Sequence, residues 1–446
     1  MNRQEMHPLR RAAWVSLISL LVLAVTVAWD NWGDLLAPPK PAPAAAVTAT
    51  EAQIEQGRYL ALAGNCMACH TTRGGAPLAG GRRIDTPFGG VYSSNLTPDP
   101  QTGLGRWTPQ DFWLAMHRGR SASGRLLTPA FPYNHTSVVT REDSDAIFAW
   151  LNTLAPVAQA QPAHTLTWPF GTQPALAVWR SLFFEPSPFN ENKAESAEWN
   201  RGAYLVQGLG HCAACHSPRN ALGATGPVHD LSGGLMPVVN WYAPNLTQDA
   251  ESGLASTPLP EIVRLLRTGA SDTAQTNGPM GEVVQHSLQH LKEADLLAMA
   301  IYLQSRAQRA TQPAPDATKL ARSSAQVSAQ VATQGAKVYE RQCLQCHGEQ
   351  GEGLKTAAGE VAYPALAGNR AVLLQDPTNL VQLVLYGGYG PATQGHPRPF
   401  GMPPAVLELH DHDIAAVLTH LRTQWGNRAG EVTPLQVNRI RAAQDR

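Results

Sequence analysis

"CMACH", residues 66–70, is the first of three five-residue stretches that share the spacing C-x-x-C-H. The second is "CAACH" at residues 212–216, and the third is "CLQCH" at residues 343–347. Together the three stretches contain all six cysteines of the 446-residue chain. A disulfide framework would not require a histidine directly after each cysteine pair, so the recurrence points to a ligand chemistry that uses the histidine as well.

The C-x-x-C-H motif is typical of covalent haem attachment. Two cysteines one helical turn apart can reach the two vinyl groups on one porphyrin edge, and the next residue, histidine, then lies beneath the iron. A zinc ribbon needs four ligands, usually from two cysteine pairs, but the pairs here lie about 130–150 residues apart. A redox C-x-x-C is expected in a βαβ setting, which this sequence does not show. We therefore predict three covalently bound haem c groups. The attaching cysteines are Cys66, Cys69, Cys212, Cys215, Cys343 and Cys346, and the proximal iron ligands are His70, His216 and His347.

Each motif lies between two helical patterns. A glycine recurs eight to ten residues before the first cysteine, where it would let one helix cross another closely; these glycines are Gly57, Gly202 and Gly335. A helical stretch follows each motif at a distance, over residues 141–154, 291–304 and 409–422, with an acid near its start at Asp143, Asp295 and Asp413. The pattern predicts a mainly α fold with three tandem cytochrome c-like helical domains.

The first two repeats resemble each other beyond the motif. Residues 93–119 match residues 243–269, so that Asn95, Thr97 and Gly103 correspond to Asn245, Thr247 and Gly253. The third repeat has a different segment at this place. The first two units therefore look like a duplication, with the third more distant.

An iron with a closed sixth position carries electrons, and methionine sulfur is one of its usual ligands. Met280 and Met402 lie in Pro- and Gly-marked segments shortly before the last helix of the second and third units. We predict them as distal ligands, although a lone methionine is more often core filler. Met299 fits that role, and Met236 is a weaker rival for the second site.

The first unit has Phe131 at the position that corresponds to these methionines, in "LLTPAFPYNHT". Phenylalanine cannot bind iron, so we predict that His135, four residues on, is the distal ligand of the first haem. Met116 and His117 are rivals, but they lie within a predicted helix.

The N-terminal region predicts a membrane anchor. Residues 1–11 contain three arginines and one acid, and residues 12–29 follow as 18 residues without a charge. That length suits a membrane span, and the arginines before it place the N-terminus in the cytoplasm. A cleaved signal peptide is the alternative. Both interpretations send the rest of the chain across the cytoplasmic (inner) membrane, so we expect the haem domains in the periplasm.

These features divide the chain into segments. The predicted boundaries are an anchor (1–36), a Pro/Ala linker (37–50), cytochrome c domain 1 (51–155), a connector (156–194), domain 2 (195–306), a linker (307–331), domain 3 (332–426) and a C-terminal tail (427–446). The connector contains several tryptophans and phenylalanines, so we expect it to pack across the domains or against a partner.

Charge excludes one class of partner. The chain has 34 lysines and arginines and 34 aspartates and glutamates, for a formal net charge of zero. Nucleic-acid-binding domains usually carry a basic excess, so we expect no nucleic-acid partner.

Residues 50–425 resemble the three-haem cytochrome c subunits of bacterial membrane-bound dehydrogenases. The three C-x-x-C-H motifs carry the resemblance, together with residues 86–108, 278–291 and 401–422. It implies a subunit that accepts electrons from a catalytic dehydrogenase subunit and passes them to ubiquinone or a terminal oxidase. A small iron–sulfur subunit is a further member that the resemblance allows.

The form of the first unit bears on the type of catalytic subunit. Alcohol- and sugar-oxidising members usually have "AMPY" where this chain has "AFPYNH" (130–135). The latter form resembles the cytochrome subunits found beside molybdenum hydroxylases that act on aldehydes or N-heterocycles. We therefore favour that partner over a quinoprotein alcohol dehydrogenase or a flavin sugar dehydrogenase. The alternatives are a haem peroxidase with an open first haem and the cytochrome subunit of a terminal oxidase.

Overall fold

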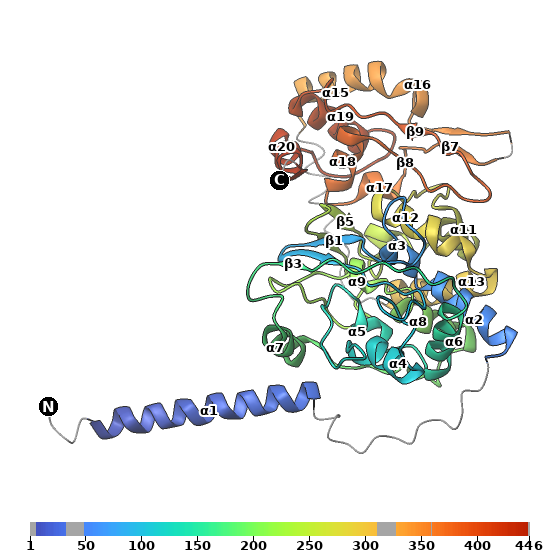
Figure 1. Cartoon of the computed structure of the whole chain (residues 1–446). Helices are drawn as coiled ribbons and strands as arrows, with labels where there is room; N and C mark the ends of the chain where they lie inside the picture. Colours follow the sequence, from blue (N-terminus) through green and yellow to red (C-terminus); the bar gives the residue numbers. More distant parts are fainter. Residues whose placement is uncertain (1–5, 33–48, 310–326, 358, 445–446) are drawn as a thin grey trace.

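The computed structural model describes residues 6–32, 49–309, 327–357 and 359–444 (Figure 1). Most of the predicted Pro/Ala linker and the centre of the second predicted linker lie outside these residues.

Three pairs of packed helices organise the described chain. They are α2 (Glu51–Ala63) with α6 (Arg141–Leu151), α8 (Ala197–Gln207) with α13 (Glu293–Arg309), and α15 (Ala329–Gln342) with α19 (Asp411–Thr423). In each pair the first helix precedes a C-x-x-C-H motif and the second follows it. We call the three pairs, with the chain between their helices, units 1, 2 and 3. The predicted helices after each motif are thus confirmed.

The predicted glycines lie where the helices of each pair cross. A Cβ atom added to Gly57 would lie 1.8 Å from the carbonyl oxygen of Ala146. At Gly202 it would lie 2.0 Å from the oxygen of Ala298, and at Gly335 it would lie 2.4 Å from that of Ala416. Because no side chain fits at these distances, glycine is required for the two helices to pack this closely.

Local sequence explains where these helices begin. The hydroxyl of Thr140 accepts a hydrogen bond from the backbone N–H of Asp143, which caps α6, and Thr50 and Ser328 cap α2 and α15 in the same way. Acidic residues occupy the first turns of α6, α13 and α19, where they complement the positive end of the helix dipole.

The remaining helices, apart from the 27-residue N-terminal helix α1 (Met6–Trp32), are short. Those before residue 250 are α3 (Cys66–His70), α4 (Pro109–Arg118), α5 (Tyr133–Thr136), α7 (Gln173–Phe183), α9 (Ala213–His216) and α10 (Asp249–Ser252). Those after it are α11 (Leu259–Thr268), α12 (Gly278–His286), the 3₁₀ helix η2 (Leu288–His290), α16 (Leu344–His347), α17 (Arg370–Leu373), α18 (Thr378–Tyr386) and α20 (Pro434–Gln444).

In the part of the chain that the structure describes, nine strands of two to four residues join into small antiparallel ribbons. The sequence did not reveal them because such runs are too short to show a period. The strands are β1 (Arg83–Thr86), β2 (Gly89–Tyr92), β3 (Thr165–Leu166), β4 (Gly234–Met236), β5 (Trp241–Ala243), β6 (Leu354–Lys355), β7 (Val361–Tyr363), β8 (Gly388–Tyr389) and β9 (Gly401–Met402). Their pairing orders are β1-β2-β3, β4-β5, β6-β7 and β8-β9.

Units 1 and 2 share one hydrophobic core, whereas unit 3 has its own. Figure 1 shows the two parts, with unit 3 in orange and red above the intermingled elements of units 1 and 2. The predicted C-terminal tail contains α20, whose Val437 and Ile440 are buried in the core of unit 3. Helix α20 (Pro434–Gln444) therefore stabilises this unit.

Two matching hydrogen bonds join units 1 and 2. The hydroxyl of Tyr59 on α2 donates to Asp295 at the start of α13, at 2.6 Å. The hydroxyl of Tyr204 on α8 donates to Asp143 at the start of α6, also at 2.6 Å. The first helix of each unit is thus hydrogen-bonded to the last helix of the other unit.

The connector packs across the units, as expected. Strand β3 extends the ribbon of unit 1, and the indole N–H of Trp179 on α7 donates to the carbonyl oxygen of Leu222 in unit 2. Helix α7 also contacts the N-terminal helix α1 (Met6–Trp32). Residues Ala12–Trp32 of α1 contain an 18-residue window with a mean hydropathy of 2.2, which suits a membrane span by length and composition.

The helix crossing in unit 3 can be tested with the substitution Gly335→Ala. Alanine favours the helix by about 1 kcal/mol, but overpacking costs about 1–3 kcal/mol, and here the new Cβ meets a backbone carbonyl that cannot rotate away. We expect the free energy of unfolding of unit 3 to fall by about 1–2 kcal/mol, measured by urea denaturation of the holoprotein.

Gly395→Ala in the same unit is the matched control. A Cβ atom at this position meets only Glu360 within 4 Å, at 3.8 Å. Its free energy of unfolding should change by less than about 0.5 kcal/mol. Equal stability of Gly335→Ala and the wild-type protein would show that the crossing is not constrained as described.

Candidate haem-binding sites

Each C-x-x-C-H motif forms a short helix directly after the first helix of its unit: α3, α9 and α16. A residue with positive φ separates the two helices in units 1 and 2. It is Asn65, with φ of 50°, in unit 1, and His211, with φ of 36°, in unit 2. This turn redirects the chain, so that the motif helix does not simply continue the helix before it.

The predicted proximal histidines share one hydrogen-bond arrangement. The distance from Nδ1 to a backbone carbonyl oxygen is 2.7 Å for His70 and Ser94, 2.7 Å for His216 and Pro244, and 2.9 Å for His347 and Pro364. A carbonyl oxygen can only accept a hydrogen bond, so Nδ1 carries the proton in all three rings. The lone pair of Nε2 is then available to a metal, and the bond fixes the orientation of the ring.

The accepting carbonyl groups of units 1 and 2 are held by the residue that follows them. Asn95 Oδ1 accepts from the backbone N–H of Thr97 at 2.9 Å and from its hydroxyl at 2.7 Å. Asn245 Oδ1 accepts the same two bonds from Thr247, at 2.9 and 2.8 Å. The predicted correspondence of Asn95 and Thr97 with Asn245 and Thr247 is therefore confirmed, and these residues position the carbonyl group that binds the histidine.

Three glycines that the sequence analysis missed support the same arrangement. Gly80, Gly233 and Gly353 each donate a backbone N–H to the carbonyl oxygen of the motif histidine, at 2.7, 2.7 and 2.9 Å. Their φ angles are 75°, 80° and 69°, a region that residues with a side chain rarely adopt. Their different distances from the motifs, 10, 17 and 6 residues, hid this recurrence.

No disulfide joins any of the six cysteines. Burial raises the pKa of Cys66 and of Cys212 to about 12, and that of Cys343 to about 11. The first thiol of each motif is thus neutral near pH 7, and it is partly exposed in all three motifs. Unpaired thiols at this spacing meet the requirement for two thioether bonds to one porphyrin.

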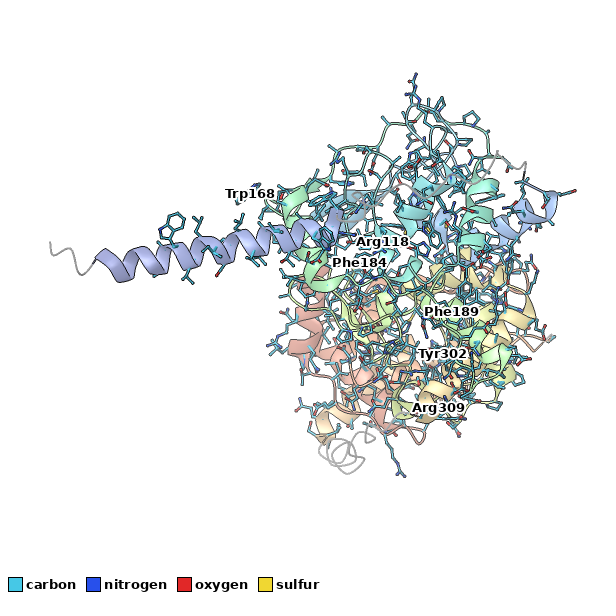
Figure 2. All side chains as sticks on the ribbon, turned by 90° about the horizontal axis from the view of Figure 1, so that it is seen from below. Arg118, Trp168, Phe184, Phe189, Tyr302 and Arg309 are labelled. Atoms are coloured by element: carbon cyan, nitrogen blue, oxygen red, sulfur yellow. The ribbon has the colours of Figure 1, made fainter. Side chains whose placement is uncertain are left out.

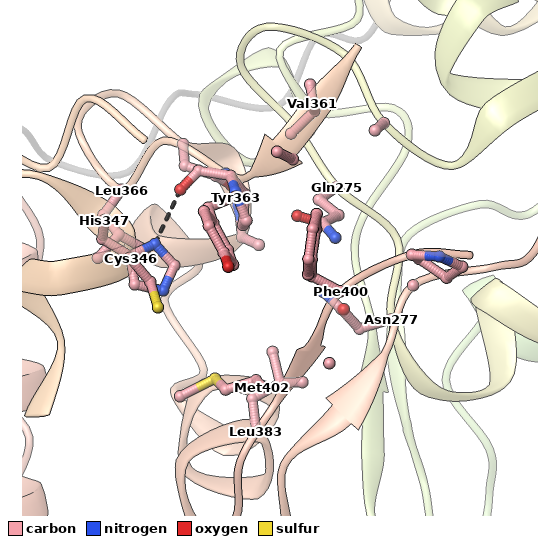
Figure 3. A pocket seen from close by; sticks show the side chains of 18 of the residues that line it. Gln275, Asn277, Cys346, His347, Val361, Tyr363, Leu366, Leu383, Phe400 and Met402 are labelled. Carbon is pink, nitrogen blue, oxygen red and sulfur yellow. Dashed lines mark hydrogen bonds between the residues drawn. The ribbon is translucent and has the colours of Figure 1, made fainter. Parts of the chain in front are cut away.

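In unit 3 the motif opens onto a cavity of about 520 Å³, within the usual range for small-molecule sites. Figure 3 shows Cys346 and His347 on one side and the sulfur-bearing side chain of Met402 across from them. The rings of Tyr363 and Phe400, 5.0 Å apart, also line the cavity. An imidazole and a thioether therefore face the same mostly apolar space.

The position of Met402 depends on a strand pair. Met402 ends β9 and pairs with Gly388 of β8, and it packs against the core of unit 3. Met280 lies on α12, is half-buried, and packs against the shared core of units 1 and 2. Met236, its weaker rival, ends strand β4.

In unit 1 the side chain of Phe131 packs against the shared core, and His135 on α5 is 2% exposed. His135 Nδ1 donates to the carbonyl oxygen of Gln207 at 3.0 Å, the arrangement found at the three motif histidines. Burial, with a smaller contribution from nearby His211, lowers the pKa of His135 to about 4. The ring is thus neutral near pH 7, with Nε2 free of a proton.

The rivals in unit 1 lie on α4, as expected. Met116 is part of the shared core, and the ring of His117 stacks on that of Trp113 with centroids 3.2 Å apart. Burial lowers the pKa of His117 to about 4. Packing thus explains Met116, whereas His117 Nδ1 is buried without a hydrogen-bond partner among the described residues.

The family model for cytochrome c matches residues 200–307 and 332–425, which cover units 2 and 3. Among curated proteins, the gluconate 2-dehydrogenase cytochrome c subunit of Pantoea cypripedii is 38% identical over 396 residues, 85% of this chain and 87% of that protein. The cytochrome c subunit of the quinone alcohol dehydrogenase of Gluconobacter oxydans is 36% identical over 88% of this chain and 83% of its own length.

A third relative has a different architecture. A nicotinate dehydrogenase subunit of Pseudomonas putida is 39% identical over 396 residues, which are 87% of this chain but 32% of that longer protein. The first two matches cover more than four-fifths of this chain and of each relative. The chain therefore belongs to the cytochrome c subunits of bacterial membrane-bound dehydrogenases, and this membership implies covalently bound haem c.

Proposed function

We propose that the chain is a three-haem electron-transfer subunit of a membrane-bound periplasmic dehydrogenase. The observation that carries the proposal is the threefold recurrence of one arrangement: a C-x-x-C-H helix, a histidine whose Nδ1 donates to a backbone carbonyl, and a close helix crossing at glycine. The three domains predicted from the sequence remain part of this proposal, including domain 1, which the family model does not match.

A bound haem c supplies an iron that exchanges one electron. The two cysteines of each motif would hold its porphyrin covalently, and His70, His216 and His347 would bind its iron through Nε2. Met280 and Met402 offer thioether sulfur in units 2 and 3. The surrounding apolar core limits water around each site, which reduces the polar reorganisation that accompanies a change of charge.

In unit 1, we assign the distal position to His135. Its Nδ1 bond to Gln207 leaves Nε2 as the only nitrogen able to bind a metal. Closure by this ligand favours electron transfer over a peroxidase, which needs an open iron. Because two imidazoles stabilise ferric iron better than one imidazole with a thioether, the first haem should have the lowest potential.

The partner dehydrogenase is proposed from the same segment. Phe131 and His135 favour a molybdenum hydroxylase, and the match to a nicotinate dehydrogenase subunit agrees, since nicotinate is an N-heterocycle. The gluconate and alcohol dehydrogenase relatives represent the competing sugar- and alcohol-oxidising types. We propose α1 as the anchor in the inner membrane, the periplasm as the location of the units, and ubiquinone or a terminal oxidase as the acceptor.

The ligand role of His135 predicts a spectroscopic change. His135→Ala should leave one of the three haems high-spin, because its iron loses a strong-field ligand, while two stay low-spin. Electron paramagnetic resonance and visible absorption measure the ratio. His135→Met should restore a low-spin iron at a higher potential than in the wild-type protein.

His290→Ala is the matched control, since His290 is an exposed histidine at the end of η2 and its loss should leave all three haems low-spin. An unaltered His135→Ala spectrum would remove His135 as a ligand. A first haem that is already high-spin and reacts rapidly with peroxide in the wild-type protein would favour the peroxidase alternative.

The methionine ligands predict changes at two other haems. Met402→Leu and Met280→Leu should each convert one haem to high-spin, and Met402→His should lower the potential of one haem in a redox titration. Met299→Leu is the control, because Met299 is 2% exposed on α13 and a volume-conserving exchange costs less than about 1.5 kcal/mol. Spectra that change with Met299 rather than with Met280 would reassign the ligand.

The partner assignment predicts the content of the native complex. Purification through an affinity tag on this subunit should recover a large catalytic subunit, three haems per copy and molybdenum in about a 1:1 ratio to this chain. Mass spectrometry and metal analysis measure these. Pyrroloquinoline quinone or covalent flavin instead of molybdenum would overturn the partner type but not the electron-transfer role, and a haem–copper subunit would favour the oxidase alternative.

A further inference from the structure

A second large cavity lies away from the C-x-x-C-H motifs, where the N-terminal helix meets the body. Its volume is about 1310 Å³. The last turn of α1 forms one wall with Trp29, Asp30 and Asn31, the end of α7 forms another, and residues 184–190 border it. Figure 2 shows Arg118 and Phe184 beside the end of α1. None of the haem ligands proposed above lines this space.

The cavity contains a buried cation without a carboxylate partner among the described residues. Arg180 on α7 lines it and is 4% exposed. Its Nε donates to Asn31 Oδ1 at 2.8 Å, and its guanidinium lies over the rings of Tyr133 and Phe184, at 5.1 and 4.5 Å. Its Nη1 is buried and has no hydrogen-bond partner. A buried charge with an unused donor is costly unless a ligand pairs with it.

The other charged groups leave the interior of the cavity positive. Arg118 and Arg120 line it as well, and Arg120 donates to the carbonyl oxygen of Asn31. The two acids in the lining, Asp30 and Glu185, are exposed, so water screens their charge. Burial and the neighbouring arginines lower the pKa of Arg180, and an anion would relieve this repulsion.

The position and the rim of the cavity indicate where the anion comes from. The cavity adjoins the end of the only membrane-span candidate found in the described chain. Exposed apolar side chains continue from it along the connector: Leu182 is 63% exposed, Val178 is 47% exposed and Trp168 is 82% exposed. A basic pocket beside apolar side chains at the end of a membrane helix has the chemistry to bind an anionic lipid.

We propose that this cavity binds the phosphate group of an anionic phospholipid of the outer leaflet, with phosphatidylglycerol as the matching head group. Arg180 donates to the phosphate from inside the cavity and Arg118 from its edge, while Leu182, Val178 and Trp168 contact acyl chains. The lipid would fix the body against the membrane through the connector as well as through α1. This inference rests on the proposed role of α1 as the anchor.

The test uses the full-length holoprotein in detergent after delipidation. Dihexanoyl phosphatidylglycerol, dihexanoyl phosphatidylcholine and inorganic phosphate are titrated below micelle-forming concentrations by calorimetry. We expect one phosphatidylglycerol to bind per chain, more tightly than either of the other two probes. A hydrogen bond to a charged group contributes about 1.5–3 kcal/mol, so Arg180→Gln should weaken binding by about tenfold or more.

Two further variants keep the test decisive if Arg180→Gln folds poorly, as judged by its haem spectrum and thermal unfolding. Arg180→Lys retains the charge and should bind with intermediate affinity. Arg118→Ala should weaken binding because it removes the charge at the edge of the cavity. Arg118 is exposed, so its loss should leave the fold intact. Arg341→Gln, an exposed arginine of unit 3, is the control and should bind as the wild-type protein does.

Equal affinity for inorganic phosphate, equal affinity for phosphatidylcholine, or binding that none of the cavity variants weakens would overturn the proposal. Membrane flotation of the full chain is measured in parallel. Failure to float, with phosphatidylglycerol binding intact, would refute the anchor and leave the lipid site standing, because the short-chain lipid needs no bilayer.

Discussion

The close crossing of the first and last helices in each unit is the constraint on which the rest of the structure depends. The backbones approach so nearly that only glycine fits at Gly57, Gly202 and Gly335. Each C-x-x-C-H motif follows the first helix directly, and the segment with the predicted distal ligand leads into the second. The helix crossing therefore holds the motif and the distal segment in place relative to each other.

The reciprocal bonds between units 1 and 2 extend this constraint across two sites. Burial of Asp295 opposes its ionisation, but hydrogen bonds from Arg201 and Tyr59 outweigh that effect and keep its pKa below the ordinary value. Arg201 approaches Asp295 with two bonds of 2.8 Å, the fork geometry that makes such pairs strong. Because the two units also share one core, they form one continuous hydrophobic body.

The contacts of His135 cross from unit 1 to unit 2. The sequence predicts His135 as a ligand of the first haem, within unit 1. Its hydrogen-bond acceptor, Gln207, belongs to unit 2. The neighbouring ring of His211, 6.5 Å away, comes from unit 2 as well. A histidine in a Pro- and Asn-containing loop gives no sign of such a contact, so only the tertiary structure shows that its Nδ1 donates to a carbonyl group of the other unit.

The sequence by itself determined the attachment chemistry, the helix pairs and the family, because thioether attachment and helix periodicity depend on residues a few positions apart. The glycines at the crossings could also be predicted, since they keep a nearly constant distance from the motifs. The carbonyl groups of Ser94, Pro244 and Pro364, the short ribbons, the shared core and the arginine cavity under α1 were decided only by the tertiary structure. These depend on contacts between residues tens to more than a hundred positions apart, whose spacing varies from unit to unit.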